Sequence, residues 1–103
     1  MDYQTKNMII NTLTKIVEDA PTKPTVKYGM TSPAYTVSGE SFGIWINYIF
    51  SVMQIISSYV DVNTCLTSIN NVVQQPNSNN DYSLQVNTIC QIILDFARTI
   101  LYL

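Results

Sequence analysis

The sequence predicts an all-α protein, a small helical bundle of three or four helices in which residues 25–37 can add a short β-hairpin insert. Three segments repeat apolar residues at alternating spacings of three and four, which places those residues on one face of a helix. Three of the four prolines and two of the three glycines fall between residues 20 and 40, so this stretch interrupts the helices. A chain of 103 residues has the length of one domain, and we expect residues 1–103 to form a single helical domain.

The first helix is predicted over residues 2–19. Asp2 can cap its start, because the carboxylate accepts free backbone N–H groups of the first turn. Pro21 lacks an N–H and restricts the residue before it, so the helix should end there. The apolar stripe of this helix, with spacings of four, three and four, consists of Ile9, Leu13, Ile16 and Ala20.

The interrupted stretch contains the two segments that can form the hairpin. Residues 25–28 and 34–37 alternate polar with apolar side chains and are rich in β-branched and aromatic residues. Residues 29–33 would form the turn between them. Because two strands alone are only marginally stable, we expect this ribbon to lean on the helices.

Residues 41–75 carry the longest periodic pattern. One helix of this length would reach about 50 Å, whereas a break near Asp61, a potential N-cap, would give two helices; the pattern allows both. The first stripe consists of Trp45, Tyr48, Val52, Ile55, Tyr59, Val62, Leu66, Ile69 and Val73. A second stripe, present only in the first half, consists of Phe42, Ile46, Ile49, Met53, Ile56 and Val60.

The last helix follows a loop at residues 76–81, which Pro76 and a run of Asn and Ser residues predict. Asp81 or Asn80 can cap this helix. It also shows two apolar stripes. The first consists of Tyr82, Val86, Ile89, Ile93, Phe96, Ile100 and Leu103, and its neighbour of Cys90, Leu94, Ala97 and Leu101.

The composition argues against catalysis. Charged residues make up only 12% of the sequence, the net charge is −2 and there is no histidine, which removes the commonest general base and metal ligand. Two cysteines 25 positions apart do not form a usual zinc site, and the three glycines match no phosphate-binding loop. We therefore expect no enzyme, no metal and no cofactor, and the acidic balance makes nucleic acid an unfavourable partner.

The compartment is predicted to be the cytoplasm. The sequence does not open with a basic segment followed by an apolar run, so no secretory signal is expected. Cys65 and Cys90 lie on apolar helix stripes, as buried free thiols in a reducing cytosol would. A membrane span over residues 42–60 is a weaker alternative, because this uncharged segment is long enough but also carries a polar stripe. That stripe consists of Asn47, Ser51, Gln54 and Ser58.

The loop at residues 22–41 is a candidate ligand site. Cations, hydroxyl groups and aromatic rings suit a small anionic, nucleotide-like ligand. A competing interpretation is a solvated hairpin whose tyrosines pack on the helices. The candidate binding residues are Lys23, Lys27, Tyr28, Tyr35 and Ser38.

The two-sided apolar helices predict self-association. A helix of a small bundle needs one apolar face, so two helices with two faces each exceed what one copy should cover. We expect a homo-oligomer, a dimer or higher. The favoured function is a non-enzymatic homo-oligomeric helical binding protein that acts by binding a protein partner. A phage or bacterial regulator or defence-related protein would have such a composition, and the alternative is an oligomer that sequesters the anionic ligand through the loop at residues 22–41.

Overall fold

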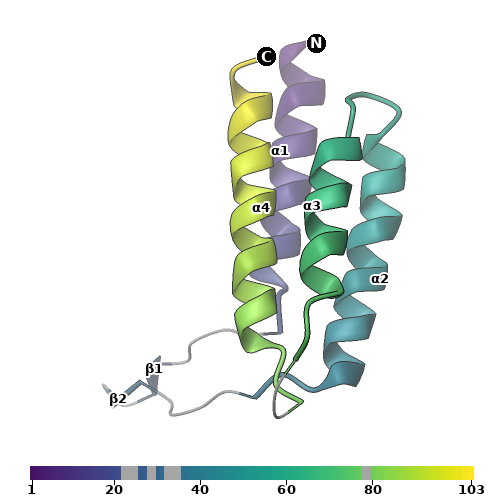
Figure 1. Ribbon diagram of the computed structural model, residues 1–103. Helices are drawn as coiled ribbons and strands as arrows, with labels where there is room; N and C mark the ends of the chain where they lie inside the picture. Colours follow the sequence, from purple (N-terminus) through teal and green to yellow (C-terminus); the bar gives the residue numbers. More distant parts are fainter. Residues whose placement is uncertain (22–25, 28–29, 32–35, 78–79) are drawn as a thin grey trace.

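Four helices run alternately in opposite directions along one bundle in the computed structural model (Figure 1). The structure describes all residues except 22–25, 28–29, 32–35 and 78–79. This architecture confirms the predicted all-α bundle. Both chain ends lie at the same end of the bundle, and the insert leaves the opposite end (Figure 1). The helices are α1 (Tyr3–Glu18), α2 (Gly39–Ile56), α3 (Asn63–Val73) and α4 (Ser83–Leu101).

Helix α1 begins and ends where its sequence predicts. The Asp2 carboxylate accepts the Thr5 backbone N–H at 2.7 Å, which satisfies one of the free donors of the first turn. The predicted stripe is buried, with Ile9, Leu13 and Ile16 fully covered. Near the chain ends, Lys6 donates a side-chain hydrogen bond to the Leu101 carbonyl at 3.3 Å and thereby joins α1 to the last turn of α4.

The insert contains two short antiparallel strands, β1 (Val26–Lys27) and β2 (Met30–Thr31), in which Val26 pairs with Thr31. The predicted position of the second strand, 34–37, is wrong for its described part, because residues 36–37 are not in a strand. Val37 is buried, and its N–H and C=O bond instead to Asp81 and Tyr82 at the start of α4.

Residues 41–75 form two helices rather than one. α2 ends at Ile56, and the chain reverses through residues 57–62 before α3 begins at Asn63. The Asp61 carboxylate accepts the Asn63 backbone N–H at 2.9 Å, so the break lies where the potential cap predicts it. The reversal lets α3 bury its own apolar stripe inside the bundle, whereas a single long helix would leave half of its length uncovered.

The two apolar stripes of α2 have different environments. The second stripe faces the core, with Phe42, Ile46, Ile49, Met53 and Ile56 all buried. Of the first stripe, only Trp45 is buried in this helix, and Tyr48 and Ile55 are exposed. The first stripe, which carries the longest heptad pattern, is therefore mostly a surface feature along α2.

Helix α4 buries most of its first apolar stripe within one copy and only part of the second. It lies between α1 and α3, so two neighbours cover it (Figure 1). Val86, Ile89, Ile93 and Ile100 are buried, as is Ala97 of the neighbouring stripe. Of that neighbouring stripe only Ala97 is buried, whereas Cys90 and Leu94 are half-buried and Leu101 is exposed, so the expectation that a second copy covers this stripe stays a prediction.

Candidate functional site

An exposed apolar ridge runs along the outer side of α2. This α2 ridge consists of Ile44, Tyr48, Val52, Ile55 and, in the turn after the helix, Tyr59. The exposed fractions are 65% for Ile44, 38% for Tyr48, 67% for Ile55 and 52% for Tyr59, and Val52 is half-buried between them. At 100° per residue Ile44, Tyr48, Val52 and Ile55 fall within one narrow arc of the helix and form a continuous line, and Tyr59 is exposed in the turn just beyond the helix end. Apolar side chains gathered in this way make the ridge a candidate interaction surface.

The α2 ridge is also free of charge. No Asp, Glu, Lys or Arg occurs from Ser41 to Val60, and the neighbouring exposed stripe contains only Asn, Ser and Gln. Glu40, in the first turn, is the only charged residue of α2. A partner that covers this face therefore desolvates no charged group along about 20 residues, which lowers the cost of association.

A groove opens where the ridge begins, between the end of α1 and the start of α2. This α1–α2 groove has a volume of about 340 Å³. Trp45 forms one wall and is held in place because its indole N–H donates to the Ile16 carbonyl at 3.1 Å inside the core. The described lining residues are Asp19, Pro21, Ser41, Ile44, Trp45 and Tyr48.

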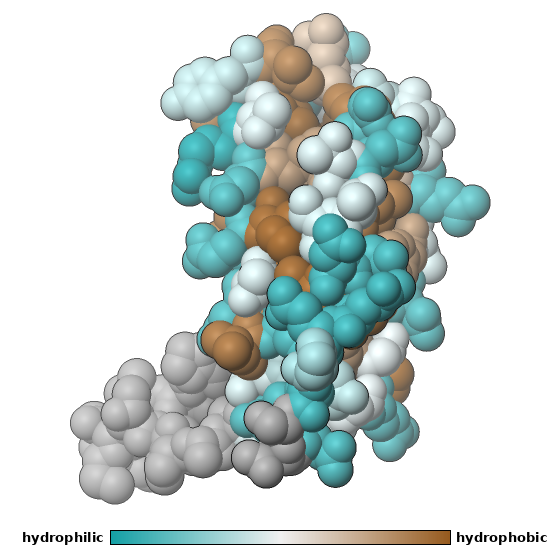
Figure 2. Space-filling model, in the orientation of Figure 1, coloured by the Kyte–Doolittle hydropathy of each residue, from teal (hydrophilic) through white to brown (hydrophobic). Residues whose placement is uncertain are grey.

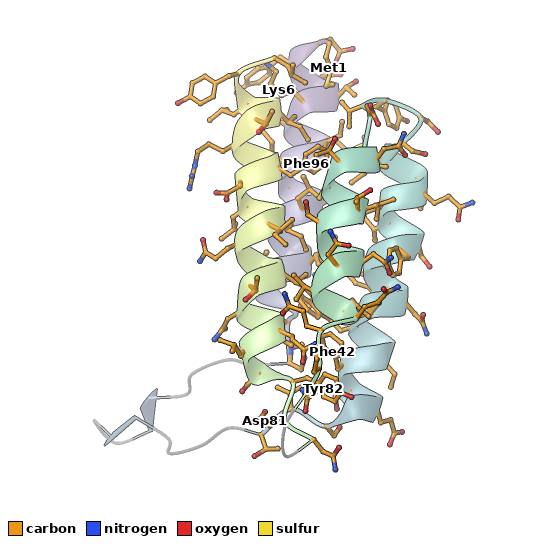
Figure 3. All side chains as sticks on the ribbon, in the orientation of Figure 1. Met1, Lys6, Phe42, Asp81, Tyr82 and Phe96 are labelled. Atoms are coloured by element: carbon orange, nitrogen blue, oxygen red, sulfur yellow. The ribbon has the colours of Figure 1, made fainter. Side chains whose placement is uncertain are left out.

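A second and larger groove, with a volume of about 890 Å³, lies at the end of the bundle where the two chain ends meet. Tyr59 belongs both to this terminal groove and to the α2 ridge, so the apolar surface continues from one to the other. Met1, which precedes α1, and Phe96 of α4 line it (Figure 3). Two carboxylates, Asp2 and Asp61, also line it, and both already accept backbone N–H groups at helix starts.

The third surface is the seam between α3 and α4. Hydrophobic side chains gather along this seam and hydrophilic ones flank it (Figure 2). The seam contains a groove of about 440 Å³ with Cys65, Ile92 and Phe96 as apolar lining and Ser68 among its polar lining. It lies on the helix pair opposite to the α1–α2 groove, so both surfaces are accessible at once.

The end of the bundle opposite the termini is held by a polar cluster. The Asp81 carboxylate accepts N–H groups from Val37 and Ser83, each at 3.0 Å, and the Ser83 hydroxyl at 3.0 Å. These bonds hold the pKa of Asp81 below its usual range. Beside it the rings of Phe42 and Tyr82 stack with centroids 4.7 Å apart (Figure 3). The cluster ties the end of the insert to α4, which is a structural role.

Gln85 is a buried polar residue that the sequence patterns did not single out. Its amide nitrogen donates to the Val72 carbonyl at 2.9 Å, and its oxygen accepts from the Asn77 amide at 2.7 Å. Asn77 also donates to the Asp81 carbonyl at 2.7 Å. The spacing in the sequence could have predicted that Gln85 is buried, since it lies three residues after Tyr82 and four before Ile89 on the apolar face of α4.

The predicted ligand loop lies largely outside the described residues and stays a prediction. Lys23, Tyr28 and Tyr35 lie outside them, and Lys27 is described only as part of β1. Ser38 is the N-cap of α2: its hydroxyl oxygen accepts the Ser41 N–H at 3.1 Å. That acceptor already occupies the helix start where an anion would bind, and Glu40 in the first turn would repel one.

Other chemistry is scarce within the described part of the chain. Burial raises the pKa of the Cys65 and Cys90 thiols to about 11, so both are poor nucleophiles near neutral pH. The described residues contain no group of three or more acidic or cysteine side chains placed to hold a metal. Within those same ranges, no helix combines the length and apolar character needed to cross a bilayer, and this includes α2, where the span over 42–60 was the weaker alternative.

The strongest candidate site is thus the α2 ridge with the groove at its start, an exposed, apolar and uncharged surface. Tyr48, Val52, Ile55 and Tyr59 of this ridge come from the stripe with the longest heptad pattern, Ile44 belongs to neither predicted stripe, and the groove adds Pro21 from the chain that follows α1. No protein-family model, curated protein or solved structure matches this chain.

Proposed function

We propose that the chain is a non-enzymatic helical binding protein that works as a homo-oligomer assembled through the α2 ridge. The observation that carries the proposal is the exposure of Ile44, Ile55 and Tyr59 in one uncharged line. Burying each such side chain contributes roughly 1.5–3 kcal/mol before the entropic cost of association. An assembly of identical copies has no need of charged groups to select between partners, which agrees with the composition of this face.

The same proposal assigns the protein partner to the seam between α3 and α4. This seam lies on the other helix pair and combines an apolar lining with polar edges, the anatomy of a modest protein interface. An oligomer formed through α2 would present two or more such seams, and linked sites bind a multivalent partner more tightly than one site does. A cytoplasmic regulator or defence-related protein of a phage or bacterium is the class proposed.

Light scattering of the wild-type protein at micromolar concentration tests the assembly. We expect a mass of at least twice the 11.6 kDa of one chain. The variant Ile55→Glu places a charge on the ridge and should give a folded monomer, since this side chain is 67% exposed. The control Gln91→Glu introduces the same charge at an exposed position of α4 and should leave the mass unchanged. A monomeric wild-type protein would refute the proposal.

A further inference from the structure

The α2 ridge has the same pattern when it is read in either direction along the helix. Ile44 and Tyr59 are equally far from its centre, between Ser51 and Val52, and so are Tyr48 and Ile55. An antiparallel copy of the ridge therefore brings Ile44 opposite Tyr59 and Tyr48 opposite Ile55. Within the helix Ile44 and Ile55 are about 16 Å apart along the axis, and Tyr59 follows in the turn beyond Ile56. This arrangement pairs an aromatic ring with an aliphatic side chain at all four contacts.

We propose that two copies pair their α2 ridges in an antiparallel, two-fold arrangement in which Tyr59 of each copy enters the α1–α2 groove of the other. This inference rests on the proposed function and specifies its geometry. A two-fold interface uses the same patch on both copies, so that patch must complement itself. The ridge does so because it has a projecting side chain, Tyr59, at one end and a groove at the other.

The groove suits a tyrosine side chain. Pro21, Trp45 and Tyr48 provide apolar and aromatic walls for the ring. Asp19 and Ser41 line the same groove with oxygen atoms that can accept a bond from the phenol hydroxyl. Tyrosine combines an apolar ring with a polar tip, and it is enriched at interfaces for that reason.

A parallel arrangement uses these features poorly. It would place Tyr59 against Tyr59 and groove against groove, which leaves the projection and the recess unmatched. Small or half-buried residues at the centre, Ser51 and Val52, allow the two helices to approach closely in the antiparallel arrangement.

The four most exposed ridge side chains offer on the order of 400 Å² of apolar surface, about half of the roughly 800 Å² that each partner of a standard interface buries. Tyr59 in the groove and the uncharged polar residues beside the ridge extend the contact.

Disulfide trapping tests the geometry. The variants Ile44→Cys and Tyr59→Cys, each carrying a distinct mass tag, are mixed in equal amounts and oxidised mildly. We expect the cross-link between the two variants to exceed either self-cross-link, because position 44 faces position 59 across the two-fold axis. The native thiols, buried at Cys65 and half-buried at Cys90 and each with a pKa of about 11, compete little. Self-cross-links that equal or exceed the mixed product would overturn the antiparallel arrangement.

Substitution of Tyr59 in the untagged protein supplies a second measurement. Tyr59→Ala should weaken association by about tenfold or more, as truncation of a central aromatic anchor does. Tyr59→Phe keeps the ring and should restore most of the affinity. The control Tyr3→Ala removes an even more exposed tyrosine on α1 and should leave association unchanged. If Tyr59→Ala associates like the wild type, the groove is not the acceptor, whereas a wild type that never associates refutes the proposed function itself.

Discussion

The Asp81 carboxylate accepts the backbone N–H of Val37 at 3.0 Å, although the two residues are 44 positions apart in the chain. The return bond is made by the main chain, since the Tyr82 N–H donates to the Val37 carbonyl at 3.1 Å. Val37 is the last buried residue before α2, and these two bonds fix where the insert rejoins the bundle. A single acidic side chain thus joins the starts of α2 and α4.

We expect Asp81→Asn to lower the melting temperature at neutral pH. The carboxylate accepts three hydrogen bonds, from the Val37 N–H, the Ser83 N–H and the Ser83 hydroxyl. The asparagine side chain has one acceptor oxygen, so at least one of these donors loses its partner. Thermal unfolding followed by circular dichroism measures the change. Asp95→Asn is the matched control, because Asp95 is an exposed carboxylate on α4 that forms an ion pair with Arg98 three residues on. Equal melting temperatures for the Asp81 variant and the wild type would contradict the assigned role.

The contribution of Asp81 should also depend on pH. Its pKa in the folded protein lies below the ordinary value of 3.8, so the folded state binds this proton more weakly than the unfolded chain does. The stabilisation is therefore fully present above about pH 5 and is lost as the pH falls through 4 and below. The difference in melting temperature between the wild type and Asp81→Asn should shrink over this range. A difference that stays constant down to pH 3 would show that the carboxylate charge is irrelevant.

The variant Gln85→Leu should lower the free energy of unfolding by about 1–3 kcal/mol, because two buried hydrogen bonds, to the Val72 carbonyl and from the Asn77 amide, are lost at about 0.5–1.5 kcal/mol each. Urea denaturation measures this loss. Gln91→Leu is the control, since Gln91 is an exposed glutamine of the same helix and the change should lie within about 0.5 kcal/mol. If both variants unfold at the same urea concentration, the network contributes nothing to stability.

Truncation of two isoleucines of α2 should affect different properties, folding stability at Ile49 and association at Ile55. Ile49 is fully buried, so Ile49→Ala should cost about 2–5 kcal/mol of folding free energy. Ile55 is 67% exposed, so Ile55→Ala should leave the stability of one copy nearly unchanged and weaken association instead. Because Ile49 belongs to the core, a charge at this position should unfold the protein rather than dissociate it. Urea denaturation of dilute samples, together with light scattering, separates the two effects. Similar losses of stability at both positions would mean that the ridge is covered within one copy.

Both cysteines should resist modification in the folded protein. Raising a thiol pKa from 9.0 to about 11 lowers the thiolate fraction at neutral pH by about 100-fold. A chromogenic disulfide reagent at pH 7.5 should therefore react slowly with the native protein and rapidly with both thiols in urea. Reaction should accelerate as the pH rises toward 11. Rapid native reaction at neutral pH would contradict the burial of these side chains.

Much of the helical structure follows from local information in the sequence. Spacings of three and four identify the apolar stripes of α1 and α4, while Asp2 and Pro21 predict the ends of α1. These signals work because a helix repeats every 3.6 residues and its free N–H groups need acceptors close in sequence. The uncharged character of residues 41–60 is likewise a property of the sequence alone.

The tertiary structure determines where the chain reverses and which of two similarly apolar stripes is buried. The heptad spacing continues unchanged from Trp45 to Val73, so periodicity alone does not reveal that the chain reverses at residues 57–62. Both stripes of α2 are similarly apolar, and packing against the other helices selected the stripe of Ile49 for the core and left that of Ile55 outside. The insert was predicted with a later second strand because alternation ignores the bonds that Asp81 and Tyr82 make to Val37. In each case the deciding contacts join residues far apart in sequence, and only the folded chain brings them together.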